Sequence, residues 1–171
     1  WFNNTSLTSF LATGLDSGTV FGYAWYNCNS LATFPAIPLT AGTNFNNAWS
    51  SCTSLTSFLA TGLDSGTNFQ SAWQGCSALA SFPALDLSSG TNFNYTWKSC
   101  PSLATWNTCT FSSDSGDSLS FAHTWYSCTA LTSFPSDVDM SRATSCDATW
   151  YNTRIVSFPA LDLSLSTNFG W

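Results

Sequence analysis

Charged residues are the scarcest feature of this 171-residue chain, at 7% of the sequence, against about a quarter in ordinary soluble domains. The formal net charge is −6 at pH 7, and the only Lys and Arg residues are Lys98, Arg142 and Arg154. Three separated cations cannot form the basic stripe that follows a phosphate backbone, so we expect no nucleic-acid partner.

Signatures of catalysis and of metal binding are missing as well. The chain holds one His, His123, and no C-x-x-C pair, so a zinc site is not expected. Serine is abundant, but no G-x-S-x-G or other nucleophile motif accompanies it. We therefore predict a protein that is not an enzyme and needs no cofactor, with His123 as an exposed polar residue.

Long apolar runs are absent too. No stretch approaches the roughly 20 apolar residues of a membrane-spanning helix, so no membrane span is expected. Solubility then has to come from Ser, Thr and Asn rather than from charge. This composition favours an extracellular location, at a cell surface or on a virion.

What the sequence does have is a period, set by tryptophan. The spacing is even from Trp1 to Trp97, and Trp125, Trp150 and Trp171 continue it at slightly uneven intervals. A period of about 24 residues is typical of a solenoid, in which each repeat buries its apolar side against its neighbours. The seven repeats begin near Trp1, Trp25, Trp49, Trp73, Trp97, Trp125 and Trp150.

Other apolar residues keep the same register. In the first six repeats Leu stands six residues after the Trp, and Phe or Trp stands nine residues after it. We expect residues that share a position to form inward columns, here called ladders. The Trp ladder is predicted to contain Trp25, Trp49, Trp73, Trp97, Trp125 and Trp150, and the Cys ladder Cys28, Cys52, Cys76, Cys100 and Cys128.

Each repeat contains two predicted elements. The run Leu-Thr-Ser-Phe and its variants are rich in β-formers and are often followed by Pro, which predicts one short strand. The run Gly-Thr-Asn-Phe-x-x-Ala-Trp predicts a turn and a short helical or 3₁₀ segment. Residues 1–171 are thus predicted to form one domain, a right-handed, leucine-rich-repeat-like β-solenoid of about seven turns.

The residues from Ala48 to Phe58 carry a resemblance to a known family. Their order, Ala-Trp-Ser-Ser-Cys-Thr-Ser-Leu-Thr-Ser-Phe, resembles the A-F-x-x-C-x-x-L-x-x-I core of BspA-type leucine-rich repeats. Mycoplasma-type surface lipoproteins and some phage fibre proteins have related repeats. The likeness runs from end to end, although Trp stands where the family usually has Phe or Met. It implies a surface-displayed adhesion or scaffold protein without catalytic residues.

The seven cysteines allow two interpretations. A disulfide framework would suit a secreted protein, and stacked neighbours about 4.8 Å apart are within bridging distance. Their side chains run parallel rather than toward each other, however, and the count is odd. Because each Cys replaces or neighbours an apolar core residue, we expect buried free thiols.

A calcium site is a weaker possibility. Asp114, Asp117, Asp137 and Asp139 cluster in the two irregular repeats, and oxygen-rich loops can hold Ca²⁺. The spacing of an EF-hand is absent, so solvated loops are the simpler interpretation.

Three asparagines, Asn3, Asn4 and Asn94, match the glycosylation sequon. The pattern is weak in a chain so rich in Asn, Ser and Thr. They are retained as possible glycosylation sites.

The predicted function follows from the two end repeats, which carry the same apolar positions as the interior ones. Neither shows the polar cap that an isolated solenoid needs. We therefore expect a segment of a longer array or a subunit that stacks head to tail on its own copies, in an extracellular structural or adhesive filament or fibre.

Two other functions stay open. Tyr residues at variable positions beside the Trp ladder could stack on sugar rings, as in a carbohydrate- or receptor-binding module of a surface or fibre protein. Ice binding is a remote alternative. Its Thr rows are interrupted by Ala, and the Thr positions are Thr8, Thr33, Thr56, Thr105 and Thr132.

Overall fold

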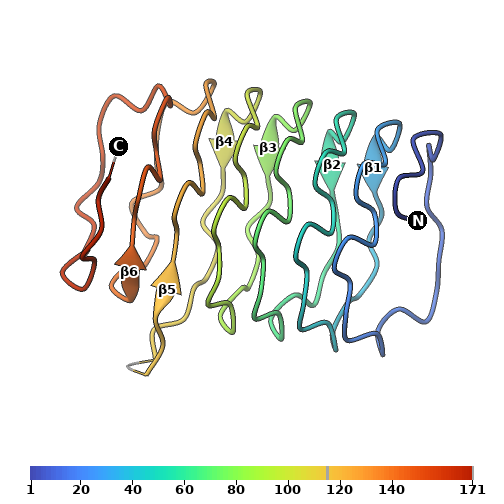
Figure 1. Ribbon diagram of the computed structural model, residues 1–171, viewed down its shortest axis with the longest axis horizontal. Helices are drawn as coiled ribbons and strands as arrows, with labels where there is room; N and C mark the ends of the chain where they lie inside the picture. Colours follow the sequence, from blue (N-terminus) through green and yellow to red (C-terminus); the bar gives the residue numbers. More distant parts are fainter. Residues whose placement is uncertain (115, 171) are drawn as a thin grey trace.

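The computed structural model describes residues 1–114 and 116–170 and shows turns lying side by side along one axis (Figure 1). Residues one period apart, such as Thr33 and Ser57, pair across neighbouring turns. The prediction of a repeat solenoid with short parallel strands and periodic Trp and Cys is confirmed. Trp171, the last member of the Trp period, lies outside the described residues.

The strands are short and pair in parallel. β1 (Thr33–Phe34) pairs with β2 (Ser57–Phe58), β3 (Ser81–Phe82) with β4 (Thr105–Trp106), and β5 (Leu119–Ser120) with β6 (Ala143–Ser145). The first four occupy the predicted position, and their aromatic residue is buried. They form one row near the top of Figure 1, whereas β5 and β6 lie lower. Isolated bridges such as Asn44↔Asn68 continue the β5 position through other turns.

The helical or 3₁₀ segment predicted for each turn is wrong, because the described residues form no helix. The Trp-containing segment is a run of overlapping turns. Its N–H groups alternate between acceptors within the segment and acceptors in the next turn. Ala24 and Tyr26 donate to carbonyls three residues back, whereas Tyr23 and Trp25 donate to the next turn. A helix would keep these bonds within the segment. Likewise, no helix in the described chain could cross a membrane.

The alternation places residues in the left-handed backbone region two positions before and two after each ladder Trp. For example, φ is 54° at Asn47, 62° at Ser51 and 74° at Gly75. Asn and Gly tolerate this region, whereas bulky residues do so at a cost of about 1–2 kcal/mol. Tyr95 and His123 nevertheless adopt it, with φ of 61° and 58°.

Aromatic rings fill the interior. Successive ladder indoles from Trp1 to Trp150 lie 5.1–6.1 Å apart between ring centroids, with planes within 11° of parallel. Ladder indoles from Trp25 to Trp125 are fully buried. Their Nε1–H groups have no hydrogen-bond partner in the described part of the chain. Apolar and ring packing, rather than hydrogen bonding, therefore orients the rings.

The turn geometry predicts a specific cost for Gly75→Ala. A Cβ at Gly75 would meet no atom closer than 3.7 Å, so the cost is backbone strain rather than a clash. We expect the free energy of unfolding to fall by about 1 kcal/mol, the left-handed penalty less the gain from a stiffer unfolded chain. Gly116→Ala is the control, because open space surrounds Gly116. Equal losses for the two variants in urea unfolding would contradict the assigned geometry.

Candidate functional site

The Cys ladder connects neighbouring turns. The thiols of Cys52, Cys76 and Cys100 donate to the carbonyl oxygen of the Trp in the preceding turn at Sγ–O distances of 3.1–3.2 Å. Cys28 and Cys128 repeat the contact. All seven cysteines are free and buried. Each ladder thiol therefore supplies a small apolar volume and a donor between turns, which Ala or Val would not.

Burial keeps these thiols protonated. Desolvation raises the pKa of Cys52, Cys109 and Cys128 to about 12. The same cause raises the pKa of Cys76 and Cys100 well above the ordinary value. Because the thiolate is the nucleophile and the metal ligand, the ladder thiols are unsuited to either role at neutral pH.

The C-terminal end of the stack carries an apolar hollow. Inside the solenoid each Phe nine residues after a Trp lies edge-on to two indoles, as Phe58 does with Trp49 at 4.8 Å and Trp73 at 5.1 Å. Phe158, eight residues after Trp150, contacts one indole among the described residues, that of Trp150 at 5.1 Å. A hollow of about 260 Å³ opens beside them. Its lining residues are Trp150, Phe158, Pro159, Leu161 and Leu163.

The N-terminal end presents two exposed aromatic rings. Trp1 stacks on Trp25 at 5.5 Å on one side and is 50% exposed. Phe2 stacks on Tyr26 at 5.3 Å and is 61% exposed.

A third candidate is an aromatic cluster on one flank, here called the flank cluster, made by Tyr95, Lys98, His123, Tyr126 and Tyr151. His123 stacks on Tyr95 at 5.0 Å and on Tyr126 at 5.4 Å between ring centroids. Tyr126 stacks on Tyr151 at 4.9 Å. The Lys98 ammonium lies 5.0 Å from the Tyr95 ring and 4.8 Å from the Tyr126 ring. Three turns thus bring a cation, an imidazole and three phenols together.

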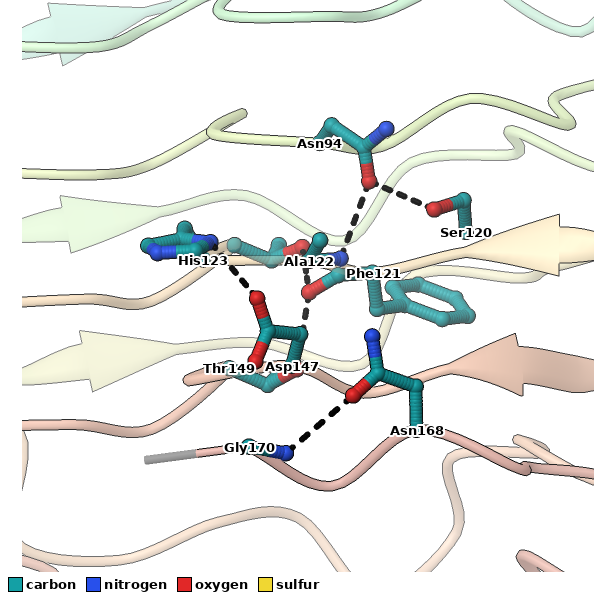
Figure 2. Close-up of polar contacts among 10 residues, drawn as sticks. Asn94, Ser120, Phe121, Ala122, His123, Asp147, Thr149, Asn168 and Gly170 are labelled. Atoms are coloured by element: carbon teal, nitrogen blue, oxygen red, sulfur yellow. Dashed lines mark hydrogen bonds and ion pairs between the residues drawn. The ribbon is translucent and has the colours of Figure 1, made fainter.

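Figure 2 shows one member of the flank cluster, His123, with Asp147 and with polar contacts of the neighbouring turns. His123 Nδ1 lies 3.8 Å from the Asp147 carboxylate, and the imidazole side chain is 23% exposed. The expectation of a simply exposed His123 is therefore wrong, because rings from two turns cover it. Asn94 accepts hydrogen bonds from the Ser120 hydroxyl at 2.6 Å and the Ala122 N–H at 2.9 Å.

Sequence reasoning missed Lys98 and Asp147 as members of this region. Lys98 shares its position, directly after the Trp, with Tyr26, Tyr126 and Tyr151. That shared position is the signal that could have placed it among the rings. Asp147 reaches His123 because the His123 N–H donates to the Asp147 carbonyl at 2.7 Å, a bond between turns that recurs at this position, as from Tyr23 to Asn46.

The calcium candidates do not converge. The carboxylates of Asp117 and Asp137 accept from the hydroxyls of Ser112 and Thr108, and Asp139 accepts from the N–H of Ser141 at 2.9 Å. Asp114 is exposed. Within residues 1–114 and 116–170, no three His, Cys, Asp or Glu side chains gather as a metal site requires.

The three sequon asparagines differ in accessibility. Asn3 and Asn4 are exposed on the first turn, whereas Asn94 is half-buried. The hydroxyl of its sequon partner Thr96 is buried and donates to the Phe69 carbonyl at 3.0 Å. The folded chain therefore presents Asn3 and Asn4 to solvent more openly than Asn94.

The raised pKa of Cys52 predicts alkaline destabilisation. The folded thiol has a pKa of about 12 against an ordinary value of 9.0, so this stabilisation is complete below pH 9 and is lost as pH rises toward 12. We expect Cys52→Ala, although less stable at pH 8, to lose stability less steeply between pH 9.5 and 11.5. The two slopes should differ by at most about 1.4 kcal/mol per pH unit, the limit for one titrating group. Parallel slopes in urea unfolding would show that the thiol is accessible to solvent.

No family model, curated protein or solved structure matches this chain. The candidate functional sites are therefore assigned from the geometry of this chain alone. That geometry offers an apolar hollow beside Trp150, two exposed rings at Trp1 and Phe2, and one aromatic flank.

Proposed function

We propose that this protein is a non-enzymatic, extracellular structural or adhesive repeat protein of a cell surface or virion, extended by end-to-end stacking into a filament or fibre. We further propose that it is a right-handed leucine-rich-repeat solenoid related to the BspA-type repeats. The observation that carries the proposal is the shared ring contact between turns: an interior Phe such as Phe58 lies edge-on to the indole of its own turn and to that of the next, so each turn's core is completed by its neighbour.

Two further observations support a structural role. The ladder thiols and the indoles from Trp25 to Trp125 are buried, and both make contacts between neighbouring turns. The bonds between turns come mainly from backbone groups, as when Trp49 N–H donates to Ala72 O at 2.8 Å. Such a ladder has an edge at each end, and open edges recruit further strands.

The first experiment is sedimentation velocity with electron microscopy of the 171-residue chain across a range of concentrations. Head-to-tail stacking should give unbranched rods that lengthen as concentration rises, because a heterologous contact that does not close continues indefinitely. Leu59→Ser, at an exposed position in the middle of the stack, should leave the length distribution unchanged. A single monomeric species at every concentration would refute the proposal.

The flank cluster supports carbohydrate binding as a second candidate. Tyr95 and His123 both occupy the left-handed position that each turn has two residues before its Trp, and this repeated geometry brings their rings together on one flank. The His123 imidazole of the cluster lies 3.8 Å from Asp147, whose carboxylate can accept sugar hydroxyls. Tyr and His rings are the side chains on which sugar rings stack.

A glycan array with Tyr126→Ala tests this candidate. The variant removes the ring that contacts His123, Tyr151 and Lys98, so bound glycans should be lost or weakened at least about tenfold. Gln74→Ala is the matched control, because Gln74 occupies the same position in an earlier turn without aromatic neighbours there. Equal binding by both variants, or none by the native chain, would rule the flank cluster out.

A further inference from the structure

We propose that the ligand of the flank cluster is an acidic glycan, and that Lys98 binds the carboxylate of a uronic acid residue in it. The proposal rests on the carbohydrate candidate above, and it names the class of sugar together with the residue that selects it. Two observations carry it, a cation that has no carboxylate partner and an amide donor that has no acceptor.

The flank cluster is reached from the side of the stack and not from its ends. Described turns lie on both sides of it, because the turn of Trp73 stacks before the turn of Lys98 and the turn of Trp150 stacks after the turn of Tyr126. Between these turns Lys98 and Tyr126 remain partly exposed. Their exposure is therefore a property of the flank and does not depend on the end turns.

Lys98 supplies a fixed positive charge. Its ammonium lies 5.0 Å from the centroid of the Tyr95 ring and 4.8 Å from that of the Tyr126 ring, which belongs to the next turn. Among the described residues this ammonium forms no ion pair, since the pair near the cluster joins His123 to Asp147, two turns beyond Lys98. Two rings thus hold the cation in place and leave its N–H groups available to an anion.

Asn94, which precedes Tyr95 in the chain, adds an unused donor. Its side-chain oxygen accepts from the Ser120 hydroxyl at 2.6 Å and from the Ala122 N–H at 2.9 Å (Figure 2). Because the Ala122 N–H can only donate, the oxygen of the amide must face it and the nitrogen must face away. This Nδ2 group has no acceptor in the described part of the chain.

These groups fit a uronic acid better than a neutral sugar. Lys98 and the free group of Asn94 are donors, and a carboxylate accepts through both of its oxygens. Hydrogen bonds between charged groups are roughly twice as strong as neutral ones, whereas a neutral sugar packed over Lys98 would remove water from the ammonium without supplying a counter-charge. The sugar hydroxyls can then be accepted by Asp147, at the other side of the cluster.

A glycan array of paired chains tests the assignment, with glucuronate in one member of each pair where the other has glucose. The native chain should bind the glucuronate member at least about tenfold more tightly, because the neutral member lacks the hydrogen bonds to a charged partner. Lys98→Gln should remove this preference, and Lys98→Arg should keep it. Gln is a conservative choice because Gln74 occupies the same position one turn earlier.

Added salt gives a second measurement. It should weaken the binding of glucuronate chains and leave the binding of their glucose partners unchanged, because salt screens the contact between charges. Equal salt dependence for both members of a pair would contradict a role for the charge of Lys98.

The outcomes separate this assignment from the carbohydrate candidate itself. Binding of neutral glycans without a preference for glucuronate would overturn the acidic ligand and leave the carbohydrate candidate in place. A preference for glucuronate that persists in Lys98→Gln would overturn the role of Lys98. No bound glycan of either kind would end both proposals. Circular dichroism verifies that the variants are folded.

Discussion

The structure depends on edge-on contacts between a Phe ring and the indoles of two neighbouring turns. A Phe such as Phe58 lies edge-on to the indole of its own turn and to that of the next. No turn can complete its core alone, because such a Phe takes one of its two edge-on indoles from the next turn. This is the energetic coupling expected of a solenoid, in which stability resides in contacts between repeats. It also makes the two end turns chemically different from the interior ones.

The backbone imposes the second constraint. Since alternate N–H groups must reach the next turn, the Trp-containing segment cannot close into a helix. The left-handed residues at positions such as Asn47 and Gly75 are the local consequence. The Cys ladder adds a thiol donor to the Trp carbonyl at each step, which explains a small, protonated, buried residue at that position.

The sequence was sufficient to predict the period, the short parallel strands and the recurrence of Trp and Cys, because these follow from spacing alone. The helical segment was predicted wrongly because Gly-Thr-Asn-Phe resembles a capped helix start, while the need for bonds between turns is not local. The sequence did contain a signal against a helix, because Asn, which tolerates positive φ, stands at two of these positions, Asn27 and Asn47. The flank cluster was only partly predictable. The Tyr positions were visible, but the contact of His123 with Asp147 depends on how turns of unequal length align.

The central claim is that the aromatic core of each turn is completed by the turns on both sides of it. A helical reconstruction of the assembled rods by electron cryomicroscopy tests this most directly. The account predicts that the end turns of successive protomers lie in contact, so that the ring stack continues at the interior spacing of 5.1–6.1 Å. A junction with solvent between the end turns, or protomers joined along their flanks, would contradict it.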